Sequence, residues 1–175
     1  AGPKGTILNE LLVRYLALGG LSINDVEFIS MGIPAAQAAL ENGSVDAALL
    51  AGPAAYNAQK SGLNVVTTGK GIITPVIVTA TSGEFYKKHK DVVEKFKKAQ
   101  DEILDYIKAN EDEALKFTAE ETGLSIEAVK SMYPQYDFSS KITAEDIKAL
   151  EATQEFMLES KMIEQKIDIK SLLLN

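Results

Sequence analysis

Two successive stretches of the chain, residues 26–43 and 45–62, share one pattern of apolar and polar positions and align without a gap. Each stretch contains an apolar run of strand length, a turn rich in Gly and Pro, a Pro-Ala-Ala sequence that favours the first turn of a helix, and a Gly where a helix would end. Each is therefore predicted to fold as strand, tight turn and short helix. We expect the strands that begin at Val26 and Val45 to lie next to each other in one parallel sheet, because both are apolar throughout.

The pattern on either side of these units predicts further elements. Apolar positions at helical spacing follow Thr6 and predict a helix that ends at Gly19. Runs rich in β-branched residues predict short strands over 64–68 and 75–79. The class predicted for this part of the chain is α/β.

Beyond Ser82 the spacing is helical. Capping signals predict three shorter helices, which begin near residues 110, 125 and 143. They follow one long amphipathic helix, whose apolar face consists of Val92, Val93, Phe96, Ala99, Ile103 and Ile107.

The turns of the repeated units are candidates for a ligand site. In a parallel sheet such turns lie at the carboxyl ends of neighbouring strands, and the free N–H groups of the following helices point into a shared crevice. Small residues at these turns allow a ligand to approach the backbone, and helix N-termini favour anionic or polar groups.

Composition excludes several classes of function. The 175 residues include 46% hydrophobic and 25% charged residues, which is typical of a globular chain. The formal net charge is −7 and Arg14 is the single Arg, which argues against a nucleic-acid partner because phosphate binding needs clustered cations. No apolar run reaches the roughly 18 residues that a membrane span requires.

The chain also lacks the residues of common catalytic and metal sites. It has no Cys and one His, His89, so thiolate chemistry is excluded and no metal site is expected. No phosphate-binding loop or nucleophile motif is present either. We therefore expect no catalytic residue, no cofactor and no enzymatic activity.

Several motifs in order resemble the nitrate/sulfonate/taurine family of ABC-transporter solute-binding proteins, and together they extend over essentially the whole chain. The motifs lie at residues 3–6, 42–47, 51–56, 71–75, 87–91, 109–114 and 142–157.

The resemblance implies a periplasmic-binding-protein type II fold, in which two α/β lobes are joined by crossing strands. Residues 1–72 would form the second lobe, and residues 73–175 would supply a crossing strand and the C-terminal helical part of the first lobe. The resemblance further implies that the chain starts inside the first crossing strand. The N-terminal half of the first lobe would then be absent, and we expect association through this missing half.

The same resemblance implies a ligand site and a function. The chain would be the solute-binding component of an ABC importer that captures a small anionic or polar solute between two lobes for a permease. The alternative is the effector-sensing domain of a transcription regulator with a similar architecture. The full-length protein would be periplasmic or anchored outside the membrane, with no signal in this chain. The implied ligand contacts are Gly5, Thr6, Met31, Gly32, Ile33, Ala51, Gly52, Pro53 and Thr74.

Overall fold

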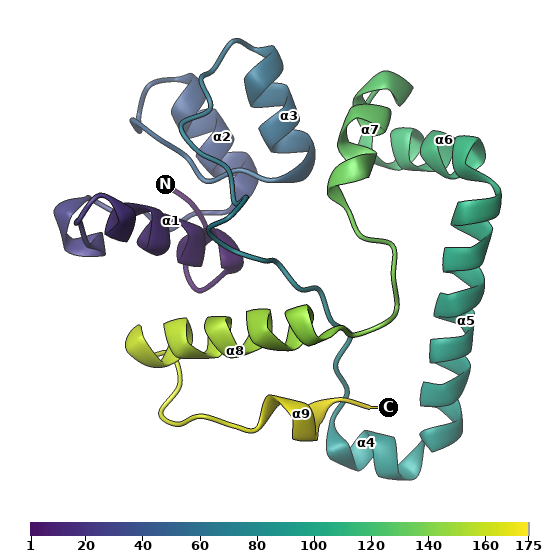
Figure 1. The fold of residues 1–175 in the computed structure, drawn as a ribbon. Helices are drawn as coiled ribbons and strands as arrows, with labels where there is room; N and C mark the ends of the chain where they lie inside the picture. The colour runs from purple at the N-terminus through teal and green to yellow at the C-terminus, as the bar shows by residue number, and fades with distance from the viewer. Residues whose placement is uncertain (175) are drawn as a thin grey trace. The chain divides into compact units, whose positions relative to one another are not determined.

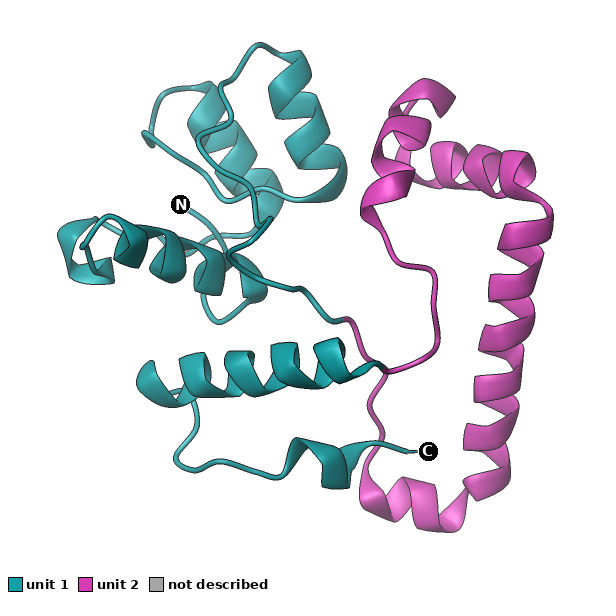
Figure 2. Ribbon diagram, in the orientation of Figure 1, with its two compact units in different colours: residues 1–76, 143–175 teal, residues 77–142 magenta. Residues whose placement is uncertain are grey.

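The structure is a computed structural model that describes residues 1–174, and it divides into two compact units (Figures 1 and 2). Unit 1 consists of residues 1–76 and 143–175, and unit 2 consists of residues 77–142. The residues at the two ends of the chain thus group together. The assignment of residues 1–72 and 73–175 to two different lobes stays a prediction. It concerns the lobes of a longer protein, and this chain would form only part of them.

The described elements of unit 1 are helical and belong to both ends of the chain (Figure 1). They are α1 (Ile7–Leu18), the 3₁₀ helix η1 (Ile23–Asp25), α2 (Ile33–Glu41), α3 (Gly52–Lys60), α8 (Ala144–Glu159) and α9 (Ile169–Leu172).

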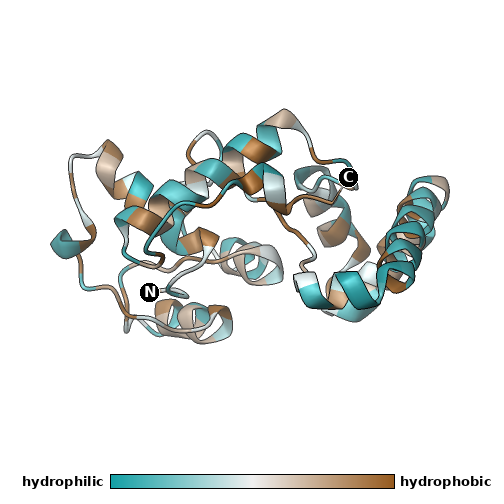
Figure 3. Ribbon diagram, turned by 90° about the horizontal axis from the view of Figure 1, so that it is seen from below, coloured by the Kyte–Doolittle hydropathy of each residue, from teal (hydrophilic) through white to brown (hydrophobic). Residues whose placement is uncertain are grey.

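The described elements of unit 2 are helical as well, and hydrophilic residues predominate along the helical ribbons at the right of Figure 3. They are α4 (Gly83–Lys88), α5 (Lys90–Ala109), α6 (Glu111–Thr122), α7 (Ile126–Met132) and the 3₁₀ helix η2 (Tyr133–Gln135).

The helices predicted after Ser82 are confirmed, and their ends follow local chemistry. The Ser125 hydroxyl accepts a hydrogen bond from the Ala128 N–H and caps α7. Thr143 and Asp146 form a reciprocal capping box at the start of α8. The backbone N–H and hydroxyl of Thr143 both bond the Asp146 carboxylate, which lowers the pKa of that group. Capping chemistry of this kind acts within one turn, so sequence is enough to place it.

The prediction of strands is wrong, because no β-strand forms among the described residues. The assigned backbone pairing is one isolated parallel bridge between Gly2 and Ser30. The Gly2 N–H donates to the Ile29 carbonyl at 3.2 Å, and the Met31 N–H donates to the Gly2 carbonyl at 3.0 Å. On the other side, the Ala1 amino group donates to the Ala47 carbonyl.

The order of these extended segments also differs from the prediction. The Leu49 N–H donates to the Ala1 carbonyl at 2.8 Å, so residues 47–49 pair with Ala1 while residues 29–31 pair with Gly2. Successive residues of an extended segment direct their backbone groups to opposite sides. Residues 1–2 therefore lie between the two segments that the repeated pattern placed side by side.

The other predicted strands, residues 64–68 and 75–79, are also not assigned as strands. Most of their residues are exposed, with Val66 72% and Ile77 92% accessible. β-branched residues favour an extended backbone, but a strand also needs a neighbour that pairs with its N–H and C=O groups. The described residues supply no such neighbour.

Each unit has a small apolar core. In unit 1, α2 packs against α3, and the buried alanines Ala36 and Ala58 lie on these helices. In unit 2, the core joins α6 and α7 around Leu115, which is 2% exposed. Leu115 groups with Ala119 and Val129, so this helical pair has its own apolar centre.

Candidate ligand-binding site

The three candidate turns lie at one edge of the paired segments in unit 1. Residues 1–2, 29–31 and 47–49 follow the hydrogen-bond alternation of parallel neighbours, so their carboxyl ends lie at the same edge. The chain leaves this edge through turns that lead into α1, α2 and α3. The structure therefore brings together the turns that contain eight of the nine predicted contacts.

The helices that start at this edge lack side-chain caps. The N-cap residues of α1, α2 and α3 are Thr6, Gly32 and Ala51, and none of their side chains caps the helix. The other described helices of unit 1 are each capped by a side chain, from Ser22, Thr143 and Asp168 respectively. Backbone N–H groups in the first turns of α1, α2 and α3 are thus left for another acceptor.

Proline reduces the number of these donors at two of the three helices. Pro34 in α2 and Pro53 in α3 lie in the first helical turn and have no N–H. Proline fits this position because its fixed φ matches the helix. The donors that remain at α2 and α3 are few and fixed in direction, which favours a small acceptor such as an oxyanion.

The first turn is held by its own polar groups. Gly5 has φ +72°, a left-handed conformation that favours glycine, and its N–H donates to Asn9 Oδ1 at 3.3 Å. The Thr6 hydroxyl donates to the Pro3 carbonyl at 2.9 Å. Two polar groups of the predicted contact residues are therefore used inside the turn, where they fix its shape.

The second and third turns combine backbone pairing with glycine. Met31 is tied to Gly2 by its N–H, so Gly32 and Ile33 follow directly from the paired edge. In the third turn Ala51 is extended, whereas Gly52 has φ +56° and begins α3. A side chain at position 52 would be strained, because L-residues rarely adopt this conformation.

Thr74 lies apart from these turns in the sequence, within a stretch of unit 1 that is neither helix nor strand. No hydrogen bond given for the described residues joins it to the three turns. Its predicted role as a ligand contact stays a prediction.

The sequence reading missed the buried polar residues behind the first turn. Asn9 is 5% exposed and Glu10 is 2% exposed, although both are polar residues of a helix that the spacing of apolar positions predicts. Asn9 holds the Gly5 turn, as described above. The signal in the sequence is an Asn-Glu pair in the first turn of a mainly apolar helix, with Arg14 four residues after the Glu.

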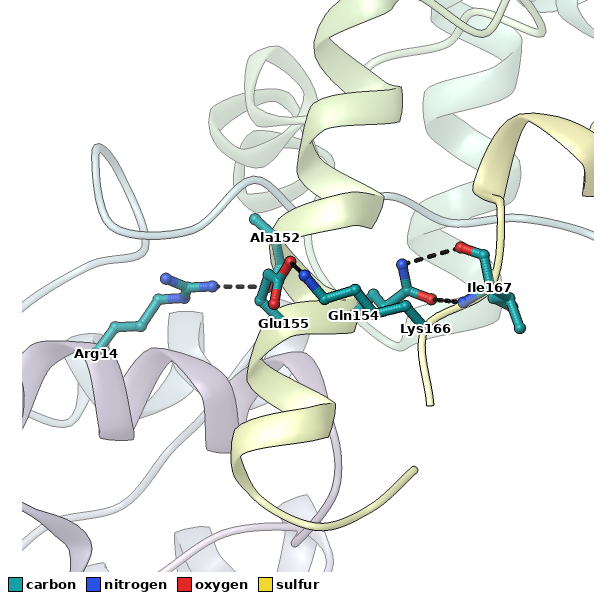
Figure 4. Close-up of polar contacts among 6 residues, drawn as sticks. All are labelled: Arg14, Ala152, Gln154, Glu155, Lys166 and Ile167. Atoms are coloured by element: carbon teal, nitrogen blue, oxygen red, sulfur yellow. Dashed lines mark hydrogen bonds and ion pairs between the residues drawn. The ribbon is translucent and has the colours of Figure 1, made fainter. Parts of the chain in front are cut away.

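Glu10 fixes α1 against α8. Its Oε1 accepts from Arg14 Nε at 2.7 Å, and its Oε2 accepts from the Thr153 hydroxyl at 3.0 Å. The guanidinium of Arg14 also donates from Nη2 to the Ala152 carbonyl at 3.0 Å (Figure 4). A buried carboxylate is tolerated because both of its oxygens are paired.

The C-terminal segment is attached to α8 by Gln154. Its amide donates to the Ile167 carbonyl at 3.1 Å and accepts from the Ile167 N–H at 2.7 Å (Figure 4). Lys166, which precedes Ile167 in the chain, forms an ion pair with Glu155 of α8. The last helices of the chain thus support the helix that carries the first candidate turn.

Replacing Asn9 with Ala is expected to loosen the first turn. The Gly5 N–H loses its acceptor, and we expect a loss of about 1 kcal/mol in unfolding free energy together with faster amide exchange at Gly5. Urea unfolding and NMR hydrogen exchange measure the two effects. Asn64→Ala, at an exposed Asn outside helices and strands, is the matched control. Unchanged exchange at Gly5 in the Asn9 variant would contradict this role.

The described residues contain no group of three or more metal-ligating side chains. None of their helices is long and apolar enough to cross a membrane.

Comparison with known proteins identifies the family. Residues 2–114 match the family model described as NMT1/THI5 like. The chain belongs to the NMT1/THI5-like family. A Bacillus subtilis (strain 168) protein named for binding aliphatic sulfonates is 30% identical over 155 residues, which cover 86% of this chain and 46% of that protein.

A second relative of this family member is named as a periplasmic binding protein of an ABC transporter. It comes from Brachyspira hyodysenteriae (strain ATCC 49526 / WA1) and is 26% identical over an alignment of 195 residues, covering 98% of this chain and 55% of the relative. The resemblance to ABC-transporter solute-binding proteins is thereby confirmed. The relatives named here are binding proteins, in agreement with a non-enzymatic family.

Two solved structures show the fold. The periplasmic aliphatic sulphonate binding protein SsuA of Escherichia coli matches with a TM-score of 0.80 at 19% identity. The alkanesulfonate-binding protein SsuA of Xanthomonas axonopodis pv. citri, solved bound to MOPS, matches with a TM-score of 0.79 at 21% identity. Each match covers 98% of this chain and 60% of the solved chain.

The matches also define how much of such a protein is present. The chain spans about half the length of the two curated relatives and 60% of the solved chains. It has the fold of the corresponding part of a periplasmic binding protein.

Proposed function

We propose that this family member is part of the solute-binding component of an ABC importer. Unit 1 would supply one wall of a cleft for a small anionic solute of the sulfonate class, and a permease would receive the solute. The observation that carries the proposal is the convergence of three helix N-termini without side-chain caps at one edge of the paired segments.

The chemistry of this edge favours an oxyanion. Backbone N–H groups and helix dipoles provide positive potential, and the small residues Gly32, Ala51 and Gly52 leave the backbone accessible. A sulfonate has three acceptor oxygens, which suits donors that come from three separate turns. The names of the B. subtilis and E. coli proteins point to the same class of ligand.

Energy considerations favour a site between two lobes. Each helix N-terminus contributes about 0.3–1 kcal/mol toward an anion. Micromolar binding requires about 8 kcal/mol. Three termini together supply less than half of this free energy, so burial of the solute against a facing lobe has to supply the rest. In the complete protein, meaning this chain with the polypeptide that completes the facing lobe, closure of the two lobes around the solute would be the state that the permease recognises.

The lobe assignment follows from the same proposal. Residues 1–72 would belong to the lobe that carries the three turns, and Thr74 would lie where the chain crosses to the other lobe. The complete protein would act in the periplasm or on the outer face of the cell membrane. The name of the E. coli protein, which describes that protein as periplasmic, supports this location.

Calorimetry on the complete protein tests the proposed ligand class. Ethanesulfonate and MOPS are expected to bind with micromolar affinity, whereas ethanol, which lacks the anionic group, is expected not to bind. Equal affinity for the sulfonate and the alcohol, or no binding of either sulfonate, would contradict the proposal.

A further inference from the structure

One charged group of unit 1 is enclosed directly behind the first candidate turn. Glu10 is 2% exposed, and its backbone N–H donates to the Thr6 carbonyl at 3.1 Å, so it lies one helical turn after the N-cap of α1. Its carboxylate would repel an anionic solute, and both of its oxygens already accept hydrogen bonds, from Arg14 and from Thr153. Glu10 is therefore not a ligand contact, and any effect that it has on binding acts through the position of the turn.

The pair of Glu10 and Arg14 contributes position rather than net stability. Taking two charges out of water costs about as much free energy as their attraction returns, and apolar residues of similar volume replace many buried ion pairs without loss. The Arg14 side chain is 35% exposed and the Glu10 side chain is 3% exposed, so the cost falls mainly on Glu10. The best-attested use of such a buried polar group is to fix the register between two helices.

The Thr153 hydroxyl supplies this register. It belongs to α8 and donates to Glu10 Oε2 at 3.0 Å, across 143 positions of the sequence. Apolar contacts are not directional, so with them alone α1 would be free to slide or rotate on α8. A hydrogen bond between a hydroxyl and a carboxylate holds only over a narrow range of distance and angle, which leaves α1 one setting.

The shape of the first turn depends on this setting. Asn9, the residue before Glu10, accepts from the Gly5 N–H at 3.3 Å. The second turn instead follows directly from the paired segments, in which the Met31 N–H is bonded to Gly2. A binding site works only when its groups stay within about 0.5 Å of the productive geometry. The first turn therefore has to be fixed relative to the other two by the helix that follows it.

We propose that Glu10 and Thr153 are positioning residues for solute binding. Their hydrogen bond holds the first turn where its donors meet those of the second and third turns. This role rests on the proposed function and deepens it, since it gives a residue of α8, far from the turns in sequence, a part in binding a small sulfonate.

Calorimetry with ethanesulfonate on the complete protein tests the proposal. Thr153→Val keeps the shape of the side chain and removes the donor, and we expect about fivefold weaker binding. Thr153→Ser restores the hydroxyl and should bind within about twofold of the parent protein. Glu10→Ala removes the acceptor, and we expect about tenfold weaker binding.

The two positions should act as one. Because Thr153 acts only through Glu10, adding Thr153→Val to Glu10→Ala is expected to weaken binding no further. Losses that add in the double variant would overturn the proposal, as would unchanged affinity in Thr153→Val.

Two variants in unit 2 control for a general loss of stability. Leu115→Ala removes a core side chain, and Thr118→Val removes a hydroxyl that donates to the Ala114 carbonyl within α6. Both variants should keep the affinity of the parent protein. A loss of affinity in either of them as large as that in Thr153→Val would show an effect of destabilisation alone and would overturn the proposal.

Amide exchange at Gly5 distinguishes this role from the proposed function itself. We expect the Gly5 amide to exchange about fivefold faster in Thr153→Val than in the parent protein, and at the parent rate in Thr118→Val. If the complete protein binds no sulfonate, the proposed function fails, and faster exchange at Gly5 still supports the positioning of the turn. Unchanged exchange at Gly5 in Thr153→Val would overturn the positioning role whether or not a sulfonate binds.

Discussion

Replacing Gly32 with Trp is expected to weaken solute binding at least about tenfold in the complete protein, or by about 1.4 kcal/mol. Gly32 is the N-cap of α2, at the edge where the three turns meet. An indole at this position would fill the space that a ligand needs in order to reach the backbone donors. Calorimetry with ethanesulfonate measures the effect.

The local geometry makes Gly32 a suitable site for this test. Its φ is −67°, which any residue adopts, and an added Cβ would meet Pro34 Cδ at an ordinary 4.0 Å. Gly32→Ala is therefore expected to bind within about twofold of the parent protein. At Gly52 the φ of +56° adds backbone strain of about 1–2 kcal/mol, so Gly52→Trp should weaken binding but would mix two effects.

The control for the added bulk is Ala152→Trp, at an exposed position of α8 whose contact with Arg14 is made by the backbone carbonyl and not by the side chain. This variant should keep the affinity of the parent even where it costs stability. Unchanged affinity in Gly32→Trp would show that the cleft lies elsewhere and that the three turns do not hold the ligand.

Replacing Leu115 with Ala is expected to lower the unfolding free energy of unit 2 by about 2–5 kcal/mol. Leu115 is 2% exposed and forms the centre of the α6–α7 core with Ala119 and Val129. Removal of its branched end leaves a cavity, because the partly buried Leu124 and Tyr133 around it cannot fully close the space. Urea unfolding followed by far-UV circular dichroism measures the loss.

Phe117→Ala in the same helix is the matched control. Phe117 is 55% exposed, so removal of its ring should change the unfolding free energy by about 0.5 kcal/mol or less. Equal losses in the two variants would show that α6 and α7 do not share the core described for unit 2.

The helices of unit 2 could be predicted because their signals are local. The apolar spacing of α5 repeats along most of its 20 residues, and Ser125 and Thr143 cap the helices that follow them directly. The interactions that place these helices act between residues three or four positions apart. For the same reason, the glycines that end α2 and α3 were recognised, and Gly43 and Gly62 do have positive φ.

The strands were predicted incorrectly because strand formation is not local. Residues 26–29 and 64–68 have a suitable composition, but composition does not specify a partner for the backbone. The repeated pattern also gave no information about the order of neighbours, and residues 1–2 lie between the two repeated segments. Pairing between segments that are distant in sequence is decided by the tertiary structure.

For the candidate site, sequence alone determined the turns, because Pro34, Pro53 and the neighbouring glycines restrict the backbone locally. The parallel pairing expected from the sequence also predicts that these turns share one edge, but only the tertiary structure decided that residues 1–2 lie between the paired segments and that Asn9 and Glu10 are buried behind the first turn. Glu10 is covered by α8, whose Thr153 lies 143 residues away in the chain. Burial of a polar side chain depends on such distant partners, because a carboxylate leaves water only where both of its oxygens find donors.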